Sequence, residues 1–178
     1  MNSERNPDTT HTDPEQSSRA GRTGVFVVAS DTERRDAFAV RRAVFVDEQG
    51  VDEEIEWDEH DEPDADATHF VAYDDGDVVG AARFRVVDGD EPARADAAEG
   101  TTGKVERVAV AADRRGEDWG RELMDALESY AREQSVERLA LHAQTHVREF
   151  YERLGYDAFG EEFEEAGIPH IEMEKDLP

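Results

Sequence analysis

Residues 108–124, VAVAADRRGEDWGRELM, join an apolar, strand-like run to a helical pattern through a charged turn. An apolar run stops at Asp113, two arginines and a glycine follow, and a helical pattern begins around a second glycine, Gly120. A strand that turns into a helix leaves the first N–H groups of that helix without intrahelical partners, and the helix dipole adds partial positive charge there. The pattern therefore predicts a phosphate-type anion site at this turn. A tight strand–helix turn with solvated arginines is the alternative interpretation.

Length and composition limit the classes of protein to consider. The chain has 178 residues and no internal repeat, which suits one domain with a buried core. It has no cysteine, so disulfides and thiolate metal sites are excluded. Its apolar runs are too short to span a membrane, and its N-terminus lacks the apolar stretch of a signal peptide. We therefore expect a cytoplasmic protein.

The net charge of −26 is extreme, and only Lys104 and Lys175 are lysines. Such excess acid argues against nucleic acid and anionic membranes as partners. It would also destabilise the fold by self-repulsion in dilute salt, whereas the Debye length falls to about 3 Å in molar salt. We interpret the composition as salt-adapted, with most surface carboxylates serving solubility.

Hydrophobic periodicity predicts one α+β (mixed α/β) domain at 25–178, preceded by a disordered tail at 1–24 that is rich in Ser, Thr, Asn, Pro and charge. The predicted strands and helices alternate along the domain. The strands are expected at 25–29, 68–73, 77–87, 104–111, 138–144, 156–163 and 170–175, and the helices at 32–46, 117–134 and 145–154.

Particular residues indicate where these helices and strands begin and end. Asp31 or Thr32 can cap the first helix, residues 74–77 (DDGD) supply a hairpin turn, and Gly155 is placed to end the last helix. Residues 47–66 hold twelve acids and no Lys or Arg, and are expected to form a loop or short helix over one side. An irregular loop is predicted at 88–103.

The turn also resembles the acetyl-CoA loop of the GNAT superfamily of N-acyltransferases. That pattern is Arg or Gln, two residues, Gly, one residue, then Gly or Ala. Arg115 and Gly120 match its ends, and Asp118 stands where the middle glycine is usual. Residues 150–156, FYERLGY, resemble the second GNAT signature, an aromatic-Tyr-x-x-x-Gly-aromatic helix end.

Three further stretches resemble the ElaA/YjcF-type branch of that superfamily, so the similarity extends over about residues 25–177. They are 40–51 (VRRAVFVDEQGV), 141–146 (LHAQTH) and 162–170 (EFEEAGIPH). The resemblance implies a central mixed, mostly antiparallel sheet of about six or seven strands, flanked by about four helices. It also implies acetyl-CoA as co-substrate, no metal, a small-molecule or peptide amine as acceptor, and a possible homodimer.

In this family a bulge in the fourth strand exposes backbone groups that bind pantetheine and face the thioester. The resemblance therefore places the cofactor on the fourth strand and the loop that follows it. The residues implied are Val108, Ala109, Val110, Arg114, Arg115, Gly116, Glu117, Asp118, Trp119, Gly120 and Arg121. An ordinary core strand would account equally well for the apolar residues among them.

Amine acetylation requires the amine to lose a proton and the leaving thiolate to gain one. Tyr151 matches the family's thiolate-protonating tyrosine, although an amphipathic aromatic at a helix end would have the same pattern, and Tyr156 is expected in the core. Glu106 and His142 are candidates for the general base. Strand alternation predicts that Glu106 points the same way as Lys104 and Val108. The candidates for acceptor binding are Glu48, Gln49, His69, Gln144 and His170.

Two functions remain open at this point. The first is an N-acetyltransferase that transfers an acetyl group directly to a primary amine in a ternary complex. The second is a non-catalytic acyl-CoA-binding sensor or interaction module of the same fold.

Overall fold

The computed structural model describes residues 19–87 and 100–178. Seven strands form one sheet in the order β1-β2-β3-β4-β5-β7-β6, and every neighbouring pair is antiparallel except β4–β5, as the predicted α+β fold requires. The elements are β1 (Gly24–Val27), α2 (Asp31–Arg41), η1 (Arg42–Glu48), α3 (Glu53–Glu56), η2 (Glu59–Asp61), β2 (Thr68–Asp74), β3 (Asp77–Val87), β4 (Thr102–Val110), η3 (Ala112–Arg114), α4 (Trp119–Glu133), β5 (Arg138–Gln144), η4 (Thr145–Val147), α5 (Arg148–Arg153), β6 (Asp157–Glu165) and β7 (Ile168–Asp176).

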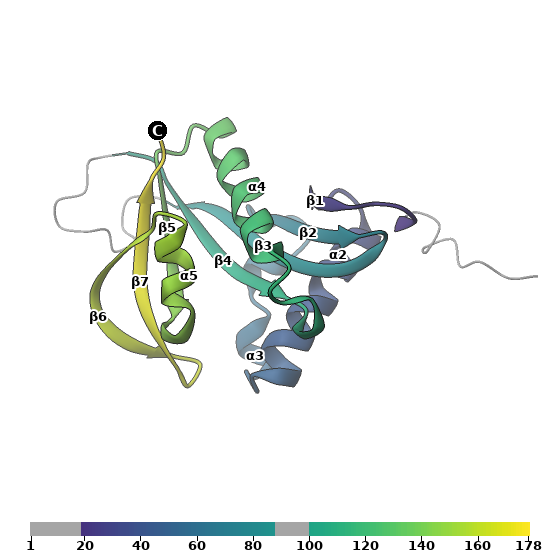
Figure 1. The fold of residues 1–178 in the computed structure, drawn as a ribbon, viewed down its shortest axis with the longest axis horizontal. Coiled ribbons are helices and arrows are strands. Elements are labelled where there is room, and N and C mark those ends of the chain that lie inside the picture. The colour runs from purple at the N-terminus through teal and green to yellow at the C-terminus, as the bar shows by residue number, and fades with distance from the viewer. Residues whose placement is uncertain (1–18, 88–99) are drawn as a thin grey trace, which may run out of the picture.

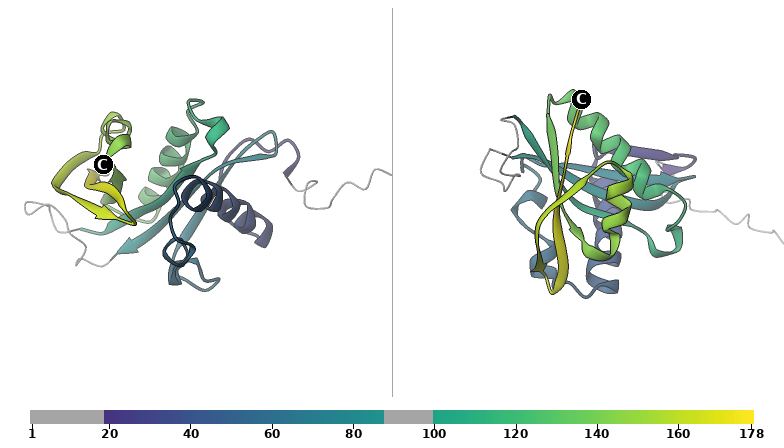
Figure 2. Two further views of the ribbon diagram at one scale, coloured as in Figure 1. Left: turned by 90° about the horizontal axis from the view of Figure 1, so that it is seen from below. Right: turned by 60° about the vertical axis from the view of Figure 1, so that its left-hand side comes forward.

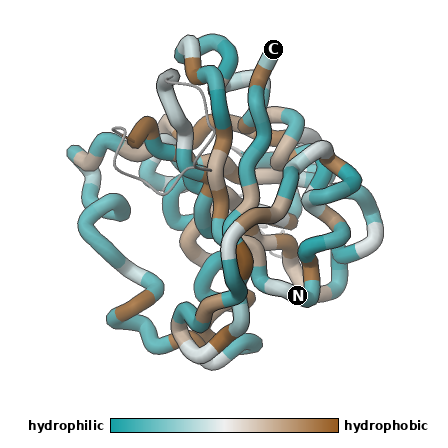
Figure 3. Tube along the Cα trace, turned by 90° about the vertical axis from the view of Figure 1, so that its left-hand side faces the viewer, coloured by the Kyte–Doolittle hydropathy of each residue, from teal (hydrophilic) through white to brown (hydrophobic). Residues whose placement is uncertain are grey.

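Helices cover both faces of the sheet, so the molecule has two cores (Figures 1 and 2). On one face the larger core packs the sheet against α4, with Leu123 and Leu127 fully buried. On the other face a smaller core packs it against α2, through Ala37 and Val40. Most of the outer loops are hydrophilic (Figure 3). Within the described ranges, no helix is long and apolar enough to cross a membrane.

The sheet splits where its single parallel pair ends. Strands β4 and β5 are paired only from Thr102 to Val105 on β4 and from Arg138 to Leu141 on β5. Beyond these residues the strands diverge, as Figure 1 shows. The backbone edges of both strands therefore face a gap instead of each other.

A bulge in β4 reverses the direction of its side chains. Ala81 pairs with Ala109 and Arg83 pairs with Glu106, so Arg107 and Val108 together oppose Ala82. Arg107 takes a left-handed conformation with φ of 54°. The bulge that the family resemblance implied is therefore present.

The predicted common direction of Glu106 and Val108 is wrong, because the bulge lies between them. Glu106 contacts Arg83 on the α2 side, whereas Val108 packs against the core on the α4 side. A period-two pattern is valid only within an uninterrupted ladder.

The first helix begins at a different residue from the predicted one. Ser30, and neither Asp31 nor Thr32, is its N-cap: the Ser30 hydroxyl accepts a hydrogen bond from the Glu33 N–H at 3.3 Å. The Glu33 carboxylate reaches back to the Ala29 N–H at 2.8 Å. This is the Ser-x-x-Glu capping pattern, which the sequence carries and which outweighs the simpler candidates.

Ordered structure also begins before the predicted boundary at residue 25. Arg22 pairs with Glu33 at 2.7 Å and its guanidinium lies 4.1 Å from the centre of the Phe26 ring. Arg19 pairs with Asp36 at 3.0 Å. Residues 19–24 therefore pack with the domain, which corrects that part of the predicted tail. Residues 1–18 and most of the predicted loop, 88–99, lie outside the described residues.

Candidate active site

A cavity of about 750 Å³ occupies the gap between the diverging strands β4 and β5. Its walls come from η1, β4, the turn that follows β4, the start of α4, β5, α5 and the β6–β7 hairpin. Almost every residue that the sequence assigned to cofactor or acceptor lines this one space. The fold therefore brings together residues that are up to 126 positions apart in the chain, from Val44 to His170.

The turn after β4 leads directly into a helix, as the sequence predicted. Helix α4 starts at Trp119, two residues later than predicted, because Asp118 is its N-cap and takes a left-handed conformation with φ of 66°. Asp118 thus adopts the conformation that a glycine would adopt most easily at this position. At Gly120 an added Cβ would lie 3.2 Å from the Phe150 ring, so a larger residue there would require this ring on α5 to shift by a few tenths of an ångström. The N–H groups of the first turn of α4 stay available to an anion.

The two arginines of the turn already have acidic partners in the protein. Arg115 makes a bidentate ion pair with Glu48, at 2.7 and 2.8 Å, and also donates to the Val110 carbonyl. The hydrogen bonds from Arg115 lower the pKa of Glu48. Arg114 pairs with Glu117 at 2.8 Å and with Asp74. Both arginines are at least partly exposed, so solvent screens these ion pairs.

One predicted cofactor residue lies outside the cavity. Glu117 turns towards Arg114 and does not line the space. The other predicted cofactor residues line it, namely Val108, Ala109, Val110, Arg114, Arg115, Gly116, Asp118, Trp119, Gly120 and Arg121.

Tyr151 lies on α5 at the inner wall of the cavity, with 8% of its surface exposed. Its ring packs against Phe150 and Tyr156, with centroids 5.0 and 5.9 Å away. Burial raises the pKa of its hydroxyl, so the group carries its proton at neutral pH. Tyr151 therefore fits both interpretations made from sequence, a packed aromatic and a proton donor, while Tyr156 is buried in the core as predicted.

Glu106 lines the cavity as an ionised carboxylate. Arg83 donates to it at 3.1 Å and Arg85 at 2.9 Å. Burial favours the protonated form, but the hydrogen bond from Arg85 and the charge of Arg83 outweigh burial and lower the pKa of Glu106. A carboxylate stabilised in this way is a weak base.

His142 and His170 meet at the β6–β7 hairpin end of the cavity. The His142 Nδ1 lies 3.2 Å from a carboxylate oxygen of Glu165, and the His142 ring meets Phe163 edge-on. That hydrogen bond lowers the pKa of Glu165. His170 is buried and its Nδ1 lies 2.7 Å from the Ile168 carbonyl. His142 is thus the more accessible of the two imidazoles.

The prediction that His69 contacts the acceptor is wrong. Its side chain is 7% exposed and lies beneath α2, edge-on to Phe38, with Nε2 3.9 Å from Asp61. Desolvation lowers the pKa of His69 to about 4. The sequence places His69 on a strand but does not show that the acidic segment folds over that strand and closes it off from the cavity.

That acidic segment is held by a buried ionic cluster, here called the Arg41 cluster: Arg41, Glu56, Asp58, Asp61 and Arg83. Arg41 is fully buried and binds Glu56 at 2.7 Å and Asp61 at 2.6 Å. Arg83, 1% exposed, binds Asp58 at 2.6 Å and also contacts Glu106. The cluster fixes α3 and η2 against the sheet beside the cavity. Sequence reasoning missed it because its partners lie 15 or more residues apart and no local pattern joins them.

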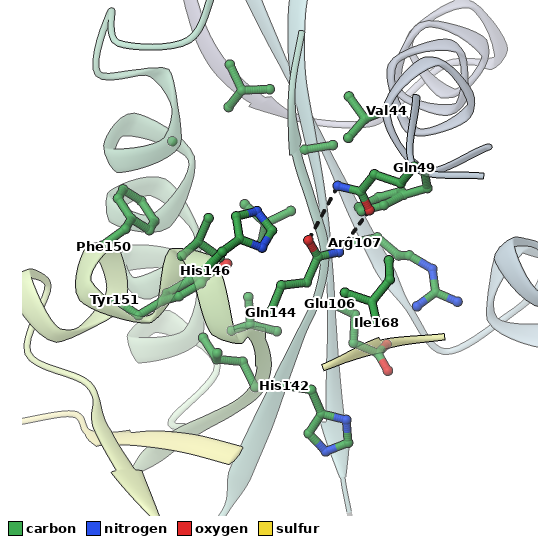
Figure 4. A pocket seen from close by; sticks show the side chains of 18 of the residues that line it. Val44, Gln49, Glu106, Arg107, His142, Gln144, His146, Phe150, Tyr151 and Ile168 are labelled. Atoms are coloured by element: carbon green, nitrogen blue, oxygen red, sulfur yellow. Dashed lines mark hydrogen bonds between the residues drawn. The ribbon is translucent and has the colours of Figure 1, made fainter. Parts of the chain in front are cut away.

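Gln49 and Gln144 meet inside the cavity through two hydrogen bonds between their side-chain amides, at 2.8 and 3.4 Å (Figure 4). Both residues were predicted near the acceptor. His146 and Arg107 also line the cavity, although the sequence assigned them no role there. Among residues 19–87 and 100–178, no group of three or more candidate ligands could hold a metal ion.

Comparisons with known proteins agree with this geometry. The acetyltransferase (GNAT) domain family matches residues 28–177. The N-acetyltransferase YjcF of Bacillus subtilis is 40% identical over 152 residues, which cover 84% of this chain and 98% of YjcF. The crystal structure of Escherichia coli ElaA superposes with a TM-score of 0.67 at 28% identity, covering 86% of this chain and 99% of ElaA. An acyl-CoA N-acyltransferase from Pseudomonas aeruginosa superposes with a TM-score of 0.66 at 28% identity, covering 85% of this chain and 98% of that one.

The split sheet, the bulged strand and the strand–helix turn with its two arginines thus occur in a chain whose sequence matches this family over most of its length. The protein belongs to the GNAT acetyltransferase family, in the branch of ElaA and YjcF, and is an acyltransferase.

Proposed function

We propose that this protein is an N-acetyltransferase that moves an acetyl group from acetyl-CoA to a primary amine by direct transfer in a ternary complex. The observation that carries the proposal is the cavity between β4 and β5, which runs from the start of α4 to the β6–β7 hairpin. Arg114, Arg115 and Arg121 gather at the α4 end, and the carboxylates of Glu106 and Glu165 lie towards the β6–β7 hairpin.

The α4 end of the cavity suits the co-substrate. Its N–H groups and arginines fit a pyrophosphate, because a helix N-terminus and guanidinium groups both favour bound phosphate. The part of β4 after Val105 has no strand partner on its β5 side, so its backbone groups can pair with the amides of a pantetheine arm. The bulge at Arg107 and Val108 widens this edge where the arm would end.

The chemistry needs a donor for the thioester oxygen and an acid for the thiolate. The backbone N–H of Val108 or Val110 is suited to the first role, because both residues line the cavity at or just after the bulge. Tyr151 is suited to the second role, because its hydroxyl is protonated and faces the same space. A thiolate formed in this buried site is also poorly solvated, which raises its own proton affinity and favours the transfer.

The hairpin end of the cavity supports a cationic amine as acceptor. Ionised Glu106 and Glu165 would attract it from solvent. Between the two candidate bases, His142 suits proton removal better than Glu106, which two arginines already hold in its ionised form. Glu165 would orient the His142 ring through its hydrogen bond to Nδ1.

The direct test is release of free thiol from acetyl-CoA in the presence of spermidine, glucosamine, lysine or a lysine-containing peptide, with mass spectrometry of the product. We expect amine-dependent thiol release and a product heavier by one acetyl group. If calorimetry detects acetyl-CoA binding but none of these amines is acetylated, the binding-module alternative would replace the enzyme for this class of acceptor.

The position of the phosphates can be tested separately at Arg115. Arg115→Glu should weaken CoA binding by about 10–100-fold, because it replaces a charge-assisted contact with repulsion. Glu48→Gln should tighten binding a few-fold, since it frees Arg115 from its bidentate partner. Arg35→Glu, on the exposed face of α2, is the matched control. Equal CoA affinities for all of these variants would place the phosphates elsewhere.

A further inference from the structure

The Gln49–Gln144 amide pair lies at the centre of the cavity. In Figure 4 it stands between Tyr151 and Phe150 on one side and Arg107 on the other. Gln144 donates to Gln49 at 2.8 Å, and Gln49 donates to Gln144 at 3.4 Å. The pair therefore bridges η1 and β5 across the split, in the region where an acceptor must meet the thioester.

Two irregular features of the backbone deliver these side chains. Gln49 follows the π-helical η1, and its N–H bonds to the carbonyl of Val44, five residues back. The wider turn rotates Gln49 relative to the position it would take in a continuous α-helix, and Gly50, with φ of 72°, ends it. Gln144 is the last residue of β5, beyond the point where β4 pairs with that strand. Neither feature is needed to fill a core, because both amides are only half-buried.

The amide pair keeps hydrogen-bonding capacity after the two groups have bonded to each other. Each carboxamide has two N–H donors and an oxygen that can accept two hydrogen bonds, and the pair uses one of each. Two oxygen lone pairs and two N–H groups therefore remain for a bound molecule. Charged and titratable side chains surround the pair on neighbouring elements: Glu48, Glu106, Arg107, His142, His146 and Tyr151.

A neutral oxygen has a particular advantage as the partner of a nucleophilic amine. A carboxylate beside an amino group stabilises the ammonium form, which has no lone pair for attack. A carboxamide oxygen accepts an N–H without adding that full negative charge. The carboxylates of the cavity can thus collect a cation, while the amides hold the amino group in a state that can lose its proton.

We propose that Gln49 and Gln144 act as one unit that positions the acceptor amino group against the thioester, through their amide oxygens. This inference rests on the proposed function. Both residues would then bind the acceptor directly, and their contact would do more than hold η1 and β5 together.

The test compares leucine and glutamate variants with the amine from the panel that wild type acetylates fastest. Gln49→Leu and Gln144→Leu should each lower kcat/KM for the amine by about 10–100-fold, as loss of a hydrogen bond to a charged or reacting group does. Acetyl-CoA affinity by calorimetry should stay within about twofold of wild type. The double variant should lose little more than either single variant, because the residues act together. Gln134→Leu, at the exposed end of α4, is the matched control.

The glutamate variants test the pH dependence of kcat/KM, which would not change if the two glutamines only held η1 and β5 together. Gln49→Glu keeps the shape of the side chain but places a carboxylate beside the amine. The rise of kcat/KM with pH should therefore move to higher pH by about one unit, while Gln134→Glu should leave it unchanged.

Two results would overturn the inference: an unchanged pH profile in Gln49→Glu, or leucine variants that lose acetyl-CoA affinity as much as amine turnover. Absence of amine-dependent turnover in wild type, with acetyl-CoA still bound, would instead reject the proposed function and this inference with it.

Discussion

The role of Tyr151 in packing can be separated from its role in catalysis by removal of its hydroxyl group. Tyr151→Phe keeps the ring contacts with Phe150 and Tyr156 and removes only the hydroxyl. We expect kcat to fall by about 10²–10⁴-fold, with little change in CoA affinity or in the KM of the amine, because protonation of the thiolate follows attack. Tyr156→Phe, in the core, is the control. Wild-type turnover in Tyr151→Phe would make this residue a packing aromatic alone.

Asp118 gives a second prediction at this scale, since it occupies a glycine position in a left-handed conformation. Asp118→Gly should raise stability by up to about 1 kcal/mol, by relief of backbone strain, and should tighten CoA binding by removal of a carboxylate near the phosphates. Asp118→Ala separates the two effects, because it removes the charge but keeps the strain. Thermal unfolding and calorimetry measure both. Weaker CoA binding in Asp118→Gly would show that the carboxylate takes part in binding.

At the scale of elements, the contact of η2 with β2 makes stability depend on pH through His69. Asp61, Arg41, Arg83 and Arg34 surround this imidazole, and its pKa falls from 6.5 to about 4 on folding. The unfolded chain therefore takes up a proton first as pH falls, and stability is lost between pH 6.5 and 4, by up to about 3 kcal/mol.

Asp61 makes stability depend on pH in a second, more acidic range. Its pKa is lowered to about 2 against 3.8 in the unfolded chain, so its contribution is present above pH 4 and is lost below it. His69→Gln should reduce the dependence of the unfolding free energy on pH only between pH 6.5 and 4. Urea unfolding from pH 4 to 7, in about 1 M KCl to screen the net charge, measures the difference. Equal slopes in the two proteins would show that His69 does not control this range.

Sequence patterns over a few residues predicted most strands and turns correctly. The errors in the prediction arise where distant residues contact each other in the fold. The predicted strand at 138–144 and the turn at 74–77 match the structure, because alternation and turn residues act over a few positions. The π-helical η1 was predicted as ordinary helix, since propensity does not distinguish the two. The cluster around Arg41 and the burial of His69 depend on partners 8 to 25 residues away, which no local pattern reveals.

For the whole molecule, the net charge of −26 predicts a strong dependence on salt. The melting temperature should rise from dilute to molar KCl by roughly 10 °C, equivalent to about 3 kcal/mol for a domain of this size, as screening removes self-repulsion. Sucrose, which stabilises by exclusion without screening, is the control and should have a smaller effect. A flat response to KCl would argue against salt adaptation.

The site as a whole was predictable in outline from motifs but not in geometry. The motifs that resemble the family contain Arg115, Gly120 and Tyr151. All three residues line the cavity, as the resemblance implied. The amide pair and the Arg115–Glu48 pair were not predictable, because each joins segments more than 60 residues apart. The bulge could not be predicted from the residues, since Val108, Ala109 and Val110 are all apolar and show no alternation.

The extra residue in β4 has a consequence for how this chain tolerates change. The strand contains two period-two patterns that are out of phase and meet at Arg107 and Val108. Deletion of either residue would bring the two patterns into phase and leave Ala109 facing α2 and Val110 facing α4, so the packing of both cores would be retained. The packing of the two cores therefore does not require the extra residue in β4. A one-residue deletion at the bulge is therefore expected to keep the fold and to narrow the strand edge that lines the cavity, whereas a deletion elsewhere in β4 would reverse the side chains on one side of it.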